Sequence, residues 1–239
     1  MPGGPTPPAL THPSPTVAIL LFTRSAGDEA QHKQFVGGTP DRNAAVAAQL
    51  IRHAQATAAR TGTTVVCLDS NRQRGATFGE RLTGAMQQVF EQGYEQLLVI
   101  GNDCPQLDES LLRRAVATLQ QGQAVLGPAT DGGVYLLGVT RQQFEAAAWQ
   151  ALPWRTAQLG AALRQQLRHA GAAVELLPPL ADVDNEQDLA RALRQPLPRL
   201  LQRRLRRLRP VAPQLRPRRL SVPLDSARRA LPRRGPPAS

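Results

Sequence analysis

The sequence has few cysteines, few aromatic residues and no long apolar segment. Its two cysteines, Cys67 and Cys104, cannot form a disulfide framework and lack the spacing of a metal site, so we expect a reducing, cytoplasmic location. No apolar run approaches the roughly 18 to 20 residues that cross a bilayer, so no transmembrane segment is expected. Residues 1–16 are rich in proline, contain no Lys or Arg and lack the order of a secretory signal. We expect them to form a disordered Pro-rich leader.

Acidic residues are almost absent from the last part of the chain. Residues 196–239 contain thirteen Arg and one acid, a net charge of +12, whereas the rest of the chain carries −1. We expect a largely disordered Arg/Pro-rich tail, with one short basic amphipathic helix at Leu197–Leu208. Such a tail is suited to polyanions, either nucleic acid or an anionic membrane face, but it has no aromatic residue for base stacking.

Between these ends, residues 17–195 are predicted to form one α/β domain. Apolar runs alternate with amphipathic segments, which favours a mostly parallel sheet with helices on both faces. The expected strands are Val17–Phe22, Thr63–Leu68, Gln96–Gly101, Ala124–Gly127, Val134–Val139 and Ala173–Leu177. The expected helices are Asn43–Thr61, Phe78–Gln92, Asp108–Gln121, Arg141–Trp149, Gln158–His169 and Asn185–Leu193. Ligands of such sheets bind beyond the carboxyl ends of the strands.

Two acidic segments follow strands of the predicted sheet. In Ile100-Gly-Asn-Asp-Cys-Pro105, the carboxylate of Asp103 comes just after a buried strand, next to Asn102. Asp182 and Asp184 flank Val183 after the last strand, so one or both can complete a metal site with Asp103. The alternative is that these acids only cap the helices that follow.

The turn Asp131-Gly132-Gly133 separates two expected strands. A plain hairpin turn is the simplest reading, because glycine allows positive φ and Asp bonds its own backbone. The bare backbone of Gly132 and Gly133 also allows a substrate to approach closely. Asp131 is then placed to accept a hydrogen bond from an attacking hydroxyl, or to act as its base.

A loop with two glycines leads into the helix that begins near Phe78. Helix N-termini favour anions, so this loop is a candidate for substrate binding, although a solvated loop is an equally good interpretation. Its candidate residues are Arg74, Gly75, Gly79, Glu80 and Arg81. Beyond the first strand, Arg24 and Lys33 are suited to offset charge on a leaving diphosphate.

The order of five motifs resembles a bacterial family, the radical-SAM/selenodomain-associated transferases, some of them named arsenosugar biosynthesis glycosyltransferases. The motifs are Phe78-Gly-Glu-Arg-Leu82, Ile100-Gly-Asn-Asp-Cys-Pro105, Gly127-Pro-Ala-Thr-Asp-Gly-Gly-Val-Tyr-Leu-Leu-Gly138, Leu152-Pro-Trp154 and Asp182-Val-Asp184. This family has a glycosyltransferase-A-like fold and is related to 2-phospholactate guanylyltransferase. The resemblance implies a Rossmann-like nucleotide-diphospho-sugar transferase fold with a divalent metal, Mg²⁺ or Mn²⁺, at Asp103 and Asp184. The segment after the first strand departs from the family's basic Gly-Arg-Val-Lys-Thr-Arg-Leu-type pattern, and only Arg24 and Lys33 match it.

Three functions follow from this interpretation. The first is a metal-dependent glycosyltransferase, in which an acceptor hydroxyl attacks the sugar of a nucleotide-diphospho-sugar and a nucleoside diphosphate leaves. The second is a guanylyltransferase-like nucleotidyltransferase, which uses a nucleoside triphosphate and releases pyrophosphate. The third is a non-catalytic binder of sugar nucleotides, since the first loop departs from the family pattern.

Overall fold

The computed structural model describes residues 17–209, so the predicted leader (1–16) and most of the predicted tail (210–239) lie outside the described residues. The strands are β1 (Val17–Phe22), β2 (Thr64–Leu68), β3 (Gln96–Ile100), β4 (Ala124–Pro128), β5 (Val134–Thr140) and β6 (Val174–Leu176). The helices are α1 (Ala26–His32), α2 (Pro40–Arg60), α3 (Phe78–Glu91), α4 (Glu109–Gln120), the 3₁₀ turn η1 (Arg141–Gln143), α5 (Ala146–Gln150), α6 (Leu159–His169), α7 (Glu186–Ala192) and α8 (Arg199–Leu208). No helix in this part of the chain is long and apolar enough to cross a bilayer.

The six strands form one mixed sheet in the order β2-β1-β3-β5-β4-β6. Strands β2, β1 and β3 pair in parallel, and so do β4 and β6, whereas β5 runs antiparallel to both of its neighbours. The sheet is therefore mostly parallel, as the sequence predicted. The predicted hairpin at the Asp-Gly-Gly turn is also confirmed as the β4–β5 pair.

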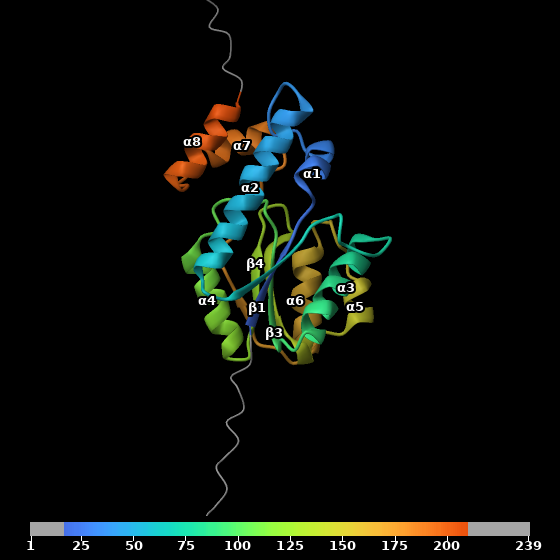
Figure 1. Ribbon diagram of the computed structural model, residues 1–239. Helices are drawn as coiled ribbons and strands as arrows, with labels where there is room; N and C mark the ends of the chain where they lie inside the picture. The colour runs from blue at the N-terminus through green and yellow to red at the C-terminus, as the bar shows by residue number, and fades with distance from the viewer. Residues whose placement is uncertain (1–16, 210–239) are drawn as a thin grey trace, which may run out of the picture.

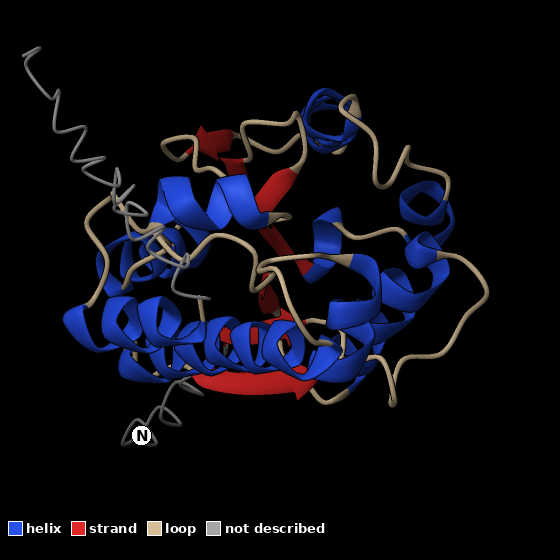
Figure 2. Cartoon of the chain, turned by 90° about the horizontal axis from the view of Figure 1, so that it is seen from above, coloured by secondary structure: helices blue, strands red, loops and turns tan. Residues whose placement is uncertain are grey.

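Helices cover both faces of the sheet because the strands are apolar on both faces. Successive residues of a strand point to opposite sides. Ala18, Leu20 and Phe22 of β1 belong to one core cluster with α3 and α6, whereas Ile19 and Leu21 belong to another with α2 and α4. Viewed from above, helices lie on both sides of the row of strands (Figure 2). This arrangement confirms the predicted fold class.

Two helical segments differ from the sequence-based expectation. Residues 26–32 form α1, which we did not expect, and the side chain of Ser25 caps it by accepting from the Asp28 N–H at 3.2 Å. The helix expected at Arg141–Trp149 is interrupted, because the Glu145 carboxylate accepts from the N–H groups of Ala147 and Ala148 and starts a new helix, α5. A side chain that caps a helix end competes with continuation of the preceding turn.

Beyond the carboxyl end of β1, helices α1, α7 and α8 gather around the first half of α2 (Figure 1). They enclose a third apolar cluster, which includes Phe35, Leu50, Leu189, Leu201 and Leu205. The helix expected at Leu197–Leu208 is present as α8 (Arg199–Leu208). It packs on α2, so the folded body continues past residue 195.

We expect Leu205→Ala to lower the free energy of unfolding by about 3 kcal/mol, because Leu205 is fully buried and its truncation leaves a cavity. Chemical denaturation monitored by circular dichroism measures the change. Leu200→Ala is the matched control, since Leu200 lies on the same helix and is 59% exposed. Equal, small effects of both substitutions would show that α8 contributes little to the fold.

Candidate active site

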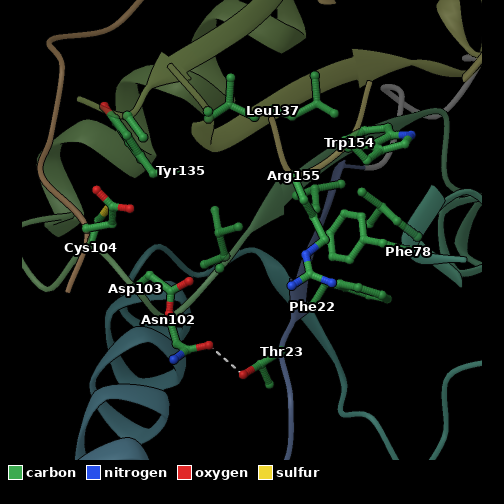
Figure 3. Close-up of a pocket in the computed structure, with 18 of the residues that line it drawn as sticks. Phe22, Thr23, Phe78, Asn102, Asp103, Cys104, Tyr135, Leu137, Trp154 and Arg155 are labelled. Atoms are coloured by element: carbon green, nitrogen blue, oxygen red, sulfur yellow. Dashed lines mark hydrogen bonds between the residues drawn. The ribbon is translucent and has the colours of Figure 1, made fainter. Parts of the chain in front are cut away.

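A cavity of about 400 Å³ opens at the carboxyl end of the sheet. The ends of β1 and β3 contribute Phe22, Thr23, Asn102 and Asp103, and β5 contributes Tyr135 (Figure 3). Segments from α1, from the loop after α5 and from residues 182–184 complete its wall. The cavity lies where ligands bind in sheets of this kind.

Lys33 connects the acidic residues at the rim of this cavity. Its Nζ lies 2.7 Å from Asp103 Oδ1, 2.8 Å from Asp184 Oδ1 and 2.8 Å from Glu29 Oε1. Lys33 is the only lysine of the chain, which otherwise uses arginine for its basic residues. A compact ammonium can direct three donors from one nitrogen towards three carboxylates, whereas no single nitrogen of the planar arginine guanidinium carries more than two donors. The predicted pair of carboxylates therefore converges on one cation, the ammonium of Lys33.

This ammonium stays charged. Burial alone would lower the pKa of Lys33, but the carboxylates of Asp103 and Glu29 outweigh it and hold the pKa above its usual value. Glu29 is only 2% exposed, and a second cation, Arg24, donates to its Oε2 at 3.0 Å. Arg24 and Lys33 are thus both paired with acids of the protein itself.

Neither Asp103 nor Asp184 caps the helix that follows it. The side chain of Asp108, and not Asp103, caps α4 by accepting from the Leu111 N–H at 2.9 Å. The side chain of Asn185, and not Asp184, caps α7 by accepting from two backbone N–H groups. Asp103 and Asp184 are therefore not needed to cap these helices.

Asn102 is a buried polar group on the cavity wall. Its Oδ1 accepts from the Thr23 hydroxyl at 2.5 Å, which joins the ends of β1 and β3. Its Nδ2 has no hydrogen-bond partner among residues 17–209, although the side chain is only 5% exposed. A buried donor without a partner favours a ligand that accepts from it. This placement is consistent with the predicted role of Asn102 in substrate binding.

Asp182 and Asp131 add negative charge near Asp184. Burial raises the pKa of Asp182 to about 6, and the charges of Asp131 and Asp184 contribute to the rise. Asp131 lines the cavity and holds its own turn, because its Oδ1 accepts from the Gly133 N–H at 2.8 Å. Of these three acids, only Asp184 forms an ion pair within residues 17–209.

Several predicted substrate-binding residues lie outside the wall of the cavity and support the local backbone. The Glu80 carboxylate closes a capping box with Thr77 at the start of α3. Arg74 donates to the carbonyls of Asn71 and Gln73.

The glycines of this loop pack against other segments. Gly75 has φ +129° and packs against the start of α3, whereas Gly79 packs against Trp154. Of this loop's candidates, only Arg81 lines the cavity, and its guanidinium donates to the carbonyls of Gly75 and Ala76.

The two glycines of the Asp-Gly-Gly turn differ in their surroundings. Gly133 lines the cavity, but Gly132 does not. Gly132 has φ +93°, and a Cβ atom there would collide with the Ala157 carbonyl oxygen. The turn thus packs backbone to backbone against the segment after α5, and the Gly160 N–H donates to the Gly132 carbonyl at 3.0 Å.

We expect Gly132→Ala to destabilise the fold by about 2 kcal/mol or more, because the added methyl group meets backbone atoms that have no room to move aside. Thermal or denaturant unfolding measures this loss. Gly171→Ala, also at positive φ but with open space around its Cβ position, is the matched control for backbone strain. A loss no larger than that of Gly171→Ala would contradict the packing argument.

Three features of the site were not predicted from the sequence. They are Glu29, the guanidinium of Arg155, and an aromatic wall of Phe22, Phe78 and Trp154. In this wall the ring centroid of Phe78 lies 5.7 Å from that of Phe22 and 5.7 Å from that of Trp154. The sequence does contain one signal for the role of Glu29. It lies four residues before Lys33, the spacing of an ion pair on a helix. The pair lies at α1, a helix that the apolar pattern does not predict.

The donor set fits a divalent cation of the Mg²⁺ or Mn²⁺ type. Asp103 and Asp184 supply hard oxygen ligands that already share one cation. Within the described residues no group of three or more His, Cys, Asp or Glu forms a metal site. Two carboxylates suffice when substrate phosphates and water supply the remaining ligands, as is usual for Mg²⁺. A metal on this pair has to displace the Lys33 ammonium.

Part of the chain matches a known family model. Residues 38–156, just under half of the chain, match the family model described as "Uncharacterized protein conserved in bacteria (DUF2064)". No curated protein matches the sequence. The cavity residues Arg24, Lys33 and Asp184 lie outside the matched range.

Among solved structures, the chain is similar to a "putative nucleotide-diphospho-sugar transferase" from Desulfovibrio desulfuricans G20, with 26% identity and a TM-score of 0.67. That alignment covers 74% of this chain and 86% of the other. A manganese complex of Rv0371c from Mycobacterium tuberculosis H37Rv matches at 18% identity over 76% of this chain and 100% of the other, with a TM-score of 0.41. The Desulfovibrio match shows that the α/β fold is that of nucleotide-diphospho-sugar transferase structures.

Proposed function

We propose that this protein is a transferase that uses a nucleotide-diphospho-sugar as donor and a small molecule as acceptor, with Mg²⁺ or Mn²⁺. One observation carries the proposal: the Asp103 and Asp184 carboxylates, from distant parts of the chain, share a single cation at the rim of the cavity. The similarity to the Desulfovibrio structure supports the donor class.

The charges on the cavity wall indicate that a diphosphate needs a further cation in order to bind there. Its wall carries four basic side chains (Arg24, Lys33, Arg81, Arg155) and five acidic ones (Glu29, Asp103, Asp131, Asp182, Asp184). Such a wall does not attract a diphosphate by itself. A divalent metal on Asp103 and Asp184 would neutralise the departing diphosphate.

The protein's own residues would then perform the remaining tasks. The buried Nδ2 of Asn102 donates to the substrate, and the aromatic wall excludes water on the opposite side of the cavity. Asp131 keeps one carboxylate oxygen on the Gly133 N–H, while its other oxygen accepts no hydrogen bond within residues 17–209. That oxygen is the base for an acceptor hydroxyl. Lys33, once displaced from the carboxylates, can contact the phosphates.

The same geometry suits the alternative, a guanylyltransferase-like nucleotidyltransferase, because both reactions require a metal-bound diphosphate or triphosphate. The product separates the two. A nucleoside diphosphate is released in the first reaction and pyrophosphate in the second.

The experiment is a binding and turnover panel with UDP-, GDP-, CDP- and dTDP-sugars and the four nucleoside triphosphates, with Mn²⁺, Mg²⁺ or EDTA. We expect metal-dependent thermal stabilisation by one donor class and slow release of nucleoside diphosphate. Stabilisation with no turnover, once candidate acceptors are supplied, would identify a non-catalytic binder. No shift with any nucleotide would contradict the proposal.

A further inference from the structure

Arg155 has an unusual backbone. Its φ of 63° is the only positive φ of a non-glycine residue in the described part of the chain. The left-handed region is disfavoured for residues with a large side chain. Residues held in such conformations gather at ligand-binding sites, where the surrounding structure maintains them.

Contacts on both sides of Arg155 fix this conformation. The Trp154 indole donates to the Trp149 carbonyl at 2.8 Å and lies against the Phe78 ring. The side after Arg155 is held by the close packing of Ala157 on Gly132. Gly79 and Gly132 therefore make room for the segment that carries Arg155, because a Cβ at either position would collide with it.

The side chain of Arg155 points into the cavity. Figure 3 shows its guanidinium between the labelled Phe22, Phe78 and Thr23, on the opposite side from Cys104. No hydrogen bond or ion pair joins it to any residue from 17 to 209. The other basic groups of the wall all have partners: Arg24 and Lys33 pair with carboxylates, and Arg81 donates to carbonyls.

We propose that Arg155 binds the diphosphate of the donor. This inference rests on the proposed function and names the protein group that holds the donor's anion. A guanidinium offers paired donors that match phosphate oxygens, and Arg155 has all of its donors available. The carboxylates of Asp103 and Asp184, which would hold the metal, lie on the acidic side of the cavity, and Arg155 lies on the aromatic side. A diphosphate between them would meet positive charge from both directions once the metal is bound.

The test is Arg155→Gly, because glycine takes a φ of 63° without strain. Titration calorimetry with pyrophosphate, UDP and GDP in Mg²⁺ measures affinity, and thermal unfolding measures stability. We expect at least a tenfold loss of affinity for the anions that the wild type binds, with a melting temperature equal to or above that of the wild type. Arg164→Gly on α6 controls for loss of charge, because Arg164 is exposed and outside the cavity.

The other outcomes separate a failure of this inference from a failure of the proposed function. Unchanged affinity in Arg155→Gly, or an equal loss in Arg164→Gly, would remove the specific role of Arg155. A lower melting temperature would show that the side chain supports its own segment instead. If the wild type binds pyrophosphate through Arg155 but no nucleotide, the anion site stands and the proposed donor class fails. If the wild type binds none of the three anions, the anion site itself fails.

Discussion

Asp103→Asn is expected to lower the rate of the proposed transfer reaction by about a hundredfold to a thousandfold. The estimate follows from the usual effect of removing one group that stabilises charge in the transition state. Asparagine keeps the shape of the side chain but removes the charge that Asp103 shares with Asp184 around one cation. It should also abolish metal-dependent thermal stabilisation. Steady-state kinetics on the best donor of the panel and a Mn²⁺ titration measure both effects.

Asp108→Asn is the matched control for Asp103→Asn. Asp108 lies five residues further along, outside the cavity, and caps α4, a position that asparagine occupies equally well. We expect wild-type kinetics and stability from it. A rate within threefold of the wild type for Asp103→Asn would exclude Asp103 from the reaction.

Lys33→Met is expected to have two opposite effects. Loss of the ammonium leaves Glu29, Asp103 and Asp184 facing one another, which should cost about 3 kcal/mol of stability at pH 7.5. The same loss vacates the position between Asp103 and Asp184, so the affinity for Mn²⁺ should rise at least tenfold. Denaturation with and without Mn²⁺ measures the two effects together, because metal binding should restore the lost stability.

The pH dependence of stability gives an independent check on Lys33. Its pKa is raised in the folded state, so its contribution is complete below its ordinary value of 10.5 and is lost as the pH rises through the folded value. The wild type therefore keeps this contribution between pH 6 and 9. In Lys33→Met the unpaired carboxylates favour protonation, so stability should increase as the pH falls towards 5.

Lys33→Arg serves as the control for charge alone. A guanidinium cannot place three donors from one nitrogen on three carboxylates, so we expect only partial recovery of stability. Full recovery in Lys33→Arg, or an unchanged Mn²⁺ affinity in Lys33→Met, would contradict the account of Lys33 as the cation that closes the carboxylate pair.

Much of the fold was predictable because burial leaves a periodic signal in the sequence. Strand β1 was expected at Val17–Phe22 and is found there, since both of its faces are buried and the run is continuously apolar. Helix α1 was missed because its seven residues include no apolar stripe, and a local cap at Ser25 specifies it. Short capped elements of this kind depend on single hydrogen bonds, which periodicity does not reveal.

The site was only partly predictable for a related reason. The rule that ligands bind at strand ends led to Asp103 and Asp184, whose carboxylates do converge. Gly79 and Gly132 were predicted to be substrate-binding residues, but the structure places them against Trp154 and Ala157. Whether a glycine makes room for a ligand or for another segment depends on tertiary packing. The left-handed backbone of Arg155 likewise has no signature in Leu152-Pro-Trp-Arg155.

The solitary lysine of this chain has a practical consequence for chemistry in solution. Reagents that acylate primary amines have only one side chain to attack, and its Nζ is shielded from solvent by the acids around it. If a bound ion displaces that amine towards the cavity, we expect its reactivity to increase. Mass-spectrometric labelling at this one atom therefore reports the opening of the carboxylate pair, with no engineered probe and no knowledge of the acceptor.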